Sequence, residues 1–180
     1  MSILNYEHNV LFIHVPRTAG TSIERAEFLG GGGHETIRDF YDVSDDVFKF
    51  SFVRNPWDRF VSALLCQDNY IEVDKDRFSQ FVMEQCTEKE TPKYGVYPMH
   101  FLPQWHFLLD NDDKLGVDFL GRYELLHVDW ETVCSILNVS YKLPHYRKVV
   151  RKPFEYYYTP ETRRIIGELY EQDVELFGYG

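Results

Sequence analysis

The pattern of apolar and polar positions predicts short strands that lead into helices. Residues 10–15 are nearly continuous in apolar side chains, which indicates a strand covered on both faces. Residues 48–53 predict a second strand, and residues 117–120 predict a third. Strands that alternate with helical segments favour an α/β fold with a small, mainly parallel central sheet flanked by helices.

Helical segments with recognisable ends lie between and after these strands. The first is expected over residues 21–29, because four glycines at 30–33 stop it. Asn55 and Pro56 predict the cap and the first residue of the second helix. Further helices are expected at 75–85, 103–109 and 130–137. Thr159 and Pro160 introduce the last helix, whose apolar stripe consists of Ile165, Ile166, Leu169, Tyr170, Val174 and Phe177.

Length and hydropathy predict one globular domain over residues 1–180. A chain of 180 residues with 44% hydrophobic residues is long enough for a core of its own. It has no apolar run of about 18 residues, so no membrane span is expected. A basic stretch followed by an apolar one is missing at the N-terminus, so no signal peptide is expected. A cytoplasmic protein without a membrane partner is the resulting prediction.

Charge and cysteine content narrow the choice of partners. The 19 basic and 29 acidic residues give a net charge of −10, which argues against a nucleic-acid partner but permits a local anion site. Cys66, Cys86 and Cys134 are odd in number and far apart, so neither a disulfide framework nor a zinc site is expected. No metal site is predicted, and a reducing compartment fits best.

The segment LFIHVPRTAGTSIE, residues 11–24, leads from the first strand into the first helix. Its loop offers the fixed charge of Arg17 and the hydroxyls of Thr18, Thr21 and Ser22 to an anion. Backbone N–H groups at the start of a helix add to such a site. The spacing is not that of the ATP-binding loop with its lysine. A plain turn with a hydroxyl cap and a surface arginine is the alternative.

A second strand–loop–helix unit has the same layout. In VRNPWDRFVSA, Arg54 follows the strand and Ser62 lies about two turns into the helix. Open α/β sheets bind their ligands at the carboxyl edge of the strands, so Arg54 is expected to reach a second phosphate of one nucleotide. In the alternative, Arg54 and Arg59 pair with Asp58 or other surface carboxylates, which contributes roughly 0–1 kcal/mol each.

Together these two segments resemble the cofactor motifs of sulfotransferases that use 3′-phosphoadenosine-5′-phosphosulfate (PAPS). HVPRTAGTS resembles the 5′-phosphosulfate loop and VRNPWDRFVSA the 3′-phosphate motif. The similarity continues in HFLPQ, in DFLGRYELL and in YYTPETRRIIGELYEQDVELFGY. It therefore covers nearly the whole chain, and it is greatest to the carbohydrate sulfotransferases and their soluble bacterial-type relatives.

The resemblance implies a P-loop-NTPase-like, three-layer fold and a role for each matched residue. The 5′-phosphosulfate is expected at Arg17, Thr18, Ala19, Gly20, Thr21 and Ser22, and the 3′-phosphate at Arg54 and Ser62. Arg17 stands where the family usually has lysine. An arginine stays protonated, so it can stabilise the charge on the leaving phosphate but is not expected to donate a proton.

A general base is needed to take the proton of the acceptor hydroxyl, and histidine suits this role near pH 7. His34 lies between the two motifs, where related carbohydrate sulfotransferases have their catalytic histidine. His100, in HFLPQ, is the second candidate, and Glu35 is a weaker one. His14 is expected to point into the core or along the cofactor cleft. The resemblance thus predicts sulfuryl transfer from PAPS to the hydroxyl of a glycan or small-molecule acceptor.

The basic segment LPHYRKVVRKPFEYYY, residues 143–158, has three interpretations. It closes over the cofactor, with Arg151 as the expected contact; it receives an acidic sugar; or it is a solvated loop. Two alternative functions also remain. A P-loop-type kinase could use the carboxylates of FLLDNDDK, residues 107–114, for Mg²⁺. A non-catalytic module could bind a nucleotide or a sulfated glycan.

Overall fold

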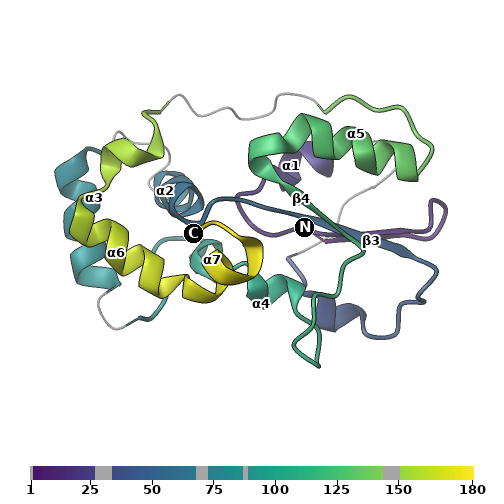
Figure 1. The fold of residues 1–180 in the computed structure, drawn as a ribbon, viewed down its shortest axis with the longest axis horizontal. Coiled ribbons are helices and arrows are strands. Elements are labelled where there is room, and N and C mark those ends of the chain that lie inside the picture. The colour runs from purple at the N-terminus through teal and green to yellow at the C-terminus, as the bar shows by residue number, and fades with distance from the viewer. Residues whose placement is uncertain (1, 27–33, 68–72, 87–88, 144–150) are drawn as a thin grey trace. The chain divides into compact units, whose positions relative to one another are not determined.

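The structure, a computed structural model, describes residues 2–26, 34–67, 73–86, 89–143 and 151–180. The chain divides into two compact units (Figure 1). Unit 1 consists of Met1–Arg54 and Gln104–Arg147, and unit 2 consists of Asn55–Pro103 and Lys148–Gly180. The single functional domain expected over residues 1–180 stays a prediction. Within the described ranges, no helix has the length and apolarity that crossing a membrane requires.

Unit 1 contains a four-stranded sheet in the order β1-β2-β3-β4. The strands are β1 (Ile3–Asn5), β2 (Val10–Ile13), β3 (Phe48–Val53) and β4 (Phe119–Arg122). β1 pairs antiparallel with β2, whereas β2, β3 and β4 are parallel. The mainly parallel sheet predicted from the sequence is confirmed, and the short antiparallel edge strand β1 is an addition to it.

Both faces of this sheet are covered, as the apolar strands predicted. Phe12 and Phe50 point to one face, where they pack with Ile23 of α1 (Gly20–Ile23) and Trp130 of α5 (Leu126–Ile136). The alternate residues Leu11 and Ile13 are also fully buried and therefore point to the opposite face. Figure 1 shows α1 and α5 on one side of the sheet and α4 (Trp105–Leu108) on the other. The flanking helices complete the predicted α/β layers.

Short helical turns connect the elements of unit 1. η1 (Ile37–Phe40) precedes β3, and η3 (Tyr123–Leu125) follows β4 directly. An isolated antiparallel bridge joins Leu109 to Leu115 after α4. These connections are short, so the residues that follow β3 and β4 stay close to the ends of the strands.

Unit 2 is helical. Its helices are α2 (Pro56–Gln67), α3 (Lys75–Gln85), α6 (Pro160–Leu169) and α7 (Glu171–Phe177), with the turns η2 (Pro98–Phe101) and η4 (Phe154–Tyr157). Phe60, Phe78, Phe101 and Tyr170 form the centre of an aromatic-rich core. The aromatic content of the sequence is thus used largely for packing.

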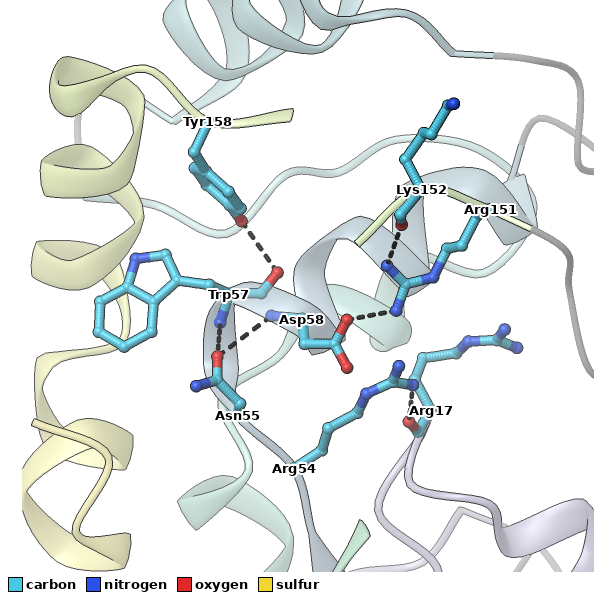
Figure 2. Close-up of polar contacts among 8 residues, drawn as sticks. All are labelled: Arg17, Arg54, Asn55, Trp57, Asp58, Arg151, Lys152 and Tyr158. Carbon is cyan, nitrogen blue, oxygen red and sulfur yellow. Dashed lines mark hydrogen bonds and ion pairs between the residues drawn. The ribbon is translucent and has the colours of Figure 1, made fainter. Parts of the chain in front are cut away.

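Several predicted helix ends are confirmed by hydrogen bonds. Asn55 Oδ1 accepts from the N–H groups of Trp57 and Asp58 at 3.1 and 3.2 Å, which caps α2 (Figure 2). Thr159 Oγ1 accepts from Thr162 N–H at 3.1 Å and caps α6. The helix predicted over 75–85 is confirmed as α3.

Other boundaries differ from the predictions. The single last helix is two helices that meet at Tyr170, because the continuous apolar stripe does not reveal the break. The third strand begins at Phe119 rather than at 117, and α5 begins at Leu126 rather than at 130. The helix predicted over 21–29 is only the short α1, which ends at Ile23 with Glu24 as its cap. The glycines at 30–33 lie outside the described residues.

Candidate active site

The carboxyl ends of three parallel strands lie at one edge of the sheet in unit 1. In the parallel register, Val10 pairs with Phe48 and Ile13 with Ser51, while Val53 pairs with Arg122. The chain leaves this edge as the loop after β2, as Arg54 after β3 and as Tyr123 after β4. Ligands of open α/β sheets bind at such an edge, so the sheet places the two predicted anion-binding segments side by side.

The loop between β2 and α1 has an unusual backbone. Arg17 and Ala19 both adopt the left-handed conformation, with φ of 71° and 74°. Such residues are strained by about 1–3 kcal/mol each, and they are frequent where a ligand is bound. Ala19 stands at the cap position of α1 and makes no side-chain cap. The first N–H groups of a helix have no partner within it, which leaves this end suited to an anion and contradicts the alternative of a hydroxyl-capped turn.

Thr18 and Gly20 shape the loop from inside. Thr18 is fully buried, and its hydroxyl donates to the carbonyl of Val15 at 2.7 Å. An anion would therefore meet the backbone of Thr18 rather than its hydroxyl hydrogen. A side chain at Gly20 would overlap the imidazole of His14. Glycine at this position lets the start of α1 lie directly against that ring.

His14 is part of this loop structure. It follows β2, is 6% exposed, and places Nδ1 2.7 Å from Oε1 of Glu24. Burial is the main cause that lowers the pKa of His14 from 6.5 to about 4, against the opposing effect of the Glu24 hydrogen bond. The imidazole is therefore neutral near pH 7, with its Nδ1–H donated to the carboxylate. His14 packs against the start of α1 at Gly20 and hydrogen-bonds Glu24. The sequence alone predicted only that it points into the core or along the cofactor cleft.

His34 lies beside His14. The two ring centroids are 4.6 Å apart, and Nδ1 of His34 is 3.3 Å from the backbone carbonyl of His14. Because a carbonyl only accepts hydrogen bonds, this contact places the proton on Nδ1 and leaves Nε2 as the basic nitrogen. Burial lowers the pKa of His34, so the ring is neutral near pH 7. The first predicted base thus adjoins the predicted anion loop.

Arg54 joins the second strand end to that loop. Its Nη1 donates to the carbonyl of Arg17 at 3.0 Å (Figure 2). Its guanidinium carbon lies 3.8 Å from the centre of the Tyr123 ring, a cation–π contact. A guanidinium has five N–H donors, so it can bind this carbonyl and an anion at the same time.

Gln104 holds the backbone of Arg54. Its Oε1 accepts from Arg54 N–H at 2.9 Å, and its Nε2 donates to the Arg54 carbonyl at 2.9 Å. The side chain of Gln104 is fully buried. Gln104 and Tyr123 lie in the sequence segments HFLPQ and DFLGRYELL, but their spacing along the chain does not reveal that they meet at Arg54.

The remaining predicted residues belong to unit 2. Ser62 is buried on α2, at 8% exposure. His100 lies in η2, is equally buried, and stacks on Tyr97 with ring centroids 5.1 Å apart. Buried Arg59 donates to the carbonyls of His100 and Leu102 at 3.0 and 2.6 Å. Arg59 is thus a structural arginine that ties the HFLPQ segment to α2.

Arg151 also lies in unit 2 and is already ion-paired. Its guanidinium contacts the carboxylate of Asp58 in the first turn of α2, and its Nη1 lies 3.3 Å from the carbonyl of Lys152 (Figure 2). The other two basic residues of this segment, Arg147 and Lys148, lie outside the described residues. The role predicted for Arg151 at the cofactor stays a prediction.

Unit 1 therefore brings together Arg17, Thr18, Ala19, Gly20, Thr21, Ser22, His34 and Arg54, whereas unit 2 contains Ser62, His100 and Arg151. Sequence reasoning missed Glu24, Gln104 and Tyr123 as parts of the site. Glu24 is the last residue of the segment 11–24. Its closeness to His14 in the sequence was the one feature from which their contact could have been predicted.

The carboxylates of residues 107–114 form a turn of their own. Asp110 Oδ1 accepts from the N–H groups of Asp112 and Lys114 at 2.8 and 2.9 Å. Asp113 is exposed and pairs with Arg38 at 3.3 Å. Across the described part of the chain, His, Cys, Asp and Glu side chains form no group of three or more that could hold a metal ion.

Comparison with known proteins agrees with this geometry. The model of the sulfotransferase family matches residues 2–180. No curated protein and no solved structure gives a significant match. The family match spans both the loop after β2 and the segment around Arg54, which lie together at the carboxyl edge of a mainly parallel sheet. The chain belongs to the sulfotransferase family.

Proposed function

We propose that this protein transfers the sulfuryl group of PAPS to a hydroxyl group of a carbohydrate acceptor. The bond between Arg54 and the Arg17 carbonyl supports this proposal most directly, because it joins the two motifs that the resemblance assigns to opposite ends of the donor. Membership of the family establishes sulfuryl transfer in general. PAPS and a carbohydrate acceptor are the specific parts of the proposal.

The loop after β2 fits the phosphosulfate end of such a donor. Its residues Arg17 and Ala19 are left-handed, and a left-handed residue next to a right-handed one is typical of the backbone turns that bind anions. Thr21 and Ser22 add hydroxyl groups at the start of α1. Arg17 supplies a permanent positive charge. PAPS supplies an activated sulfuryl group, and these residues would stabilise the negative charge that remains on the 5′-phosphate.

Arg54 fits the 3′-phosphate, and Ser62 is proposed as its second contact. The backbone of Arg54 is fixed by Gln104, and its guanidinium is fixed by Tyr123 and the Arg17 carbonyl. A planar guanidinium can bind a phosphate with two parallel N–H donors. We propose that Arg151 completes the cofactor site by leaving Asp58 for the bound nucleotide.

His34 is the proposed general base. Its Nδ1–H is held by the His14 carbonyl, so Nε2 is the nitrogen that would accept the proton of the acceptor hydroxyl. The lowered pKa of His34, caused mainly by burial, keeps this nitrogen unprotonated near pH 7. The acceptor oxygen then forms a bond to sulfur, while the bond between sulfur and the phosphate oxygen breaks. His100 is the alternative base.

A cytoplasmic location is also proposed. Cys66, Cys86 and Cys134 all lie in described segments and none of them forms a disulfide, which suits a reducing compartment.

Transfer of label from ³⁵S-PAPS tests the reaction directly. The protein is incubated with glycans, phenols and small alcohols in the presence of EDTA. We expect labelled glycan without added metal. Binding of PAPS without transfer to any acceptor would favour the non-catalytic module, and a requirement for Mg²⁺ with ATP as donor would favour the kinase.

A further inference from the structure

The backbone of Arg54 is held by the side chain of Gln104 in the way that a neighbouring strand would hold it. The last register pair of β3 and β4 joins Val53 to Arg122. One residue further on, the amide of Gln104 donates to the carbonyl of Arg54 and accepts from its N–H, both at 2.9 Å. The partners fix the orientation of this amide, because the N–H can only donate and the carbonyl can only accept.

Tyr123 holds the other end of Arg54. Its ring lies 3.8 Å from the guanidinium carbon, close enough for a strong cation–π contact. The ring comes from η3, which follows β4 without an intervening loop. The sheet itself therefore fixes the position of the ring.

A third contact sets the direction of the guanidinium. Its Nη1 donates to the carbonyl of Arg17 at 3.0 Å. An arginine side chain loses rotamer freedom when it is fixed. Fixing Arg54 before the ligand arrives removes this cost from binding.

We infer that Gln104 and Tyr123 are positioning residues that aim Arg54 at the 3′-phosphate of the donor and so make the enzyme select a 3′-phosphorylated nucleotide. This inference rests on the proposed function. Neither residue needs to contact the nucleotide, since both act through Arg54. Gln104 holds the backbone at the strand end, and Tyr123 holds the plane of the guanidinium.

The test compares the affinity for adenosine 3′,5′-bisphosphate with that for adenosine 5′-monophosphate by titration calorimetry. The dissociation constant for adenosine 5′-monophosphate divided by that for adenosine 3′,5′-bisphosphate measures the preference for a 3′-phosphate. We expect Tyr123→Leu to lower this ratio roughly threefold to 30-fold, the loss expected for a cation–π contact. Tyr123→Phe retains the aromatic face and should restore the ratio. Tyr41→Leu, at a tyrosine of unit 1 that is 81% exposed, is the matched control.

Gln104→Glu supplies a second readout. Near pH 7.5 the ionised carboxylate presents an acceptor to the Arg54 carbonyl, so the ratio should fall. Burial at this position raises the pKa of a carboxyl group. Lowering the pH toward 5.5 therefore increases the protonated fraction that can donate again, and the ratio should rise relative to the native protein at the same pH. A general disruption of the fold would weaken the binding of both nucleotides and leave the ratio unchanged. Circular dichroism confirms that each variant is folded.

The experiment distinguishes failure of the proposed PAPS specificity from failure of the positioning role alone. If the native protein shows no preference for the 3′-phosphate, both the proposed PAPS specificity and this inference are overturned. If the native protein shows the preference but Tyr123→Leu and Gln104→Glu keep it in full, only the positioning role is overturned.

Discussion

Acidification from about pH 7.5 to pH 5 should destabilise the native protein through His14. Its pKa is lowered from 6.5 to about 4, mainly by burial. Between these values the unfolded chain binds a proton at His14 that the folded protein does not, so the free energy of unfolding falls as the pH falls. From pH 6.5 to pH 5, at about 1.4 kcal/mol for each pH unit, the loss is about 2 kcal/mol.

Glu24 acts in a lower pH range. Burial alone would raise its pKa, but the hydrogen bond from His14 contributes to a net lowering from 4.5 to about 2. Its stabilising contribution is therefore present above pH 4.5 and is lost below it. Measurements between pH 5 and pH 7.5 consequently report on His14 rather than on Glu24.

Urea denaturation of the native protein and of His14→Gln across this pH range isolates the effect. Burial also lowers the pKa values of His34 and His106, so the difference between the native protein and His14→Gln is needed to assign the effect to His14. Between pH 7.5 and pH 5, the free energy of unfolding of the native protein should fall by about 2 kcal/mol more than that of His14→Gln. His127→Gln, at an exposed histidine of α5, is the control and should retain the native pH dependence. Equal pH dependence in the native protein and His14→Gln would refute the burial of a neutral His14.

Three further outcomes are expected. Arg54→Ala should weaken binding of adenosine 3′,5′-bisphosphate by about 1.5–3 kcal/mol in calorimetry, and an unchanged affinity would remove Arg54 from the site. His34→Ala should lower kcat roughly 10²–10⁴-fold with little change in donor binding; such a loss in His100→Ala instead would reassign the base. Arg59→Met leaves the carbonyls of His100 and Leu102 without their donor and should lower the free energy of unfolding in urea by about 2–4 kcal/mol. Its control is Arg164→Met, at a side chain that is 61% exposed, and equal stability of the two variants would contradict the structural role of Arg59.

Arg17 stands where the resemblance to the family led us to expect a lysine. It lies in the strained part of the loop, with φ of 71°, and its carbonyl is held by Arg54. These contacts fix its backbone, whereas its side chain supplies charge without a transferable proton. The proposed mechanism therefore assigns Arg17 charge stabilisation alone.

Local signals in the sequence determined the strand–loop–helix segments and their caps. Apolar runs predicted β2 and β3, and Asn55 with Pro56 predicted the start of α2. These features depend on hydrogen bonds and side-chain periods within a few residues, so they can be recognised from the sequence. The same segments carried the resemblance that led to Arg17, His34 and Arg54.

Only the tertiary structure decided how these segments support one another. Gln104 meets Arg54 across 50 positions of the chain, and Tyr123 reaches Arg54 because β4 pairs with β3. The pKa of His14 depends on burial by the surrounding fold. The break between α6 and α7 at Tyr170 accompanies a hydrogen bond from its hydroxyl to Phe101. Such contacts join residues that are distant in the chain, so no local pattern specifies them.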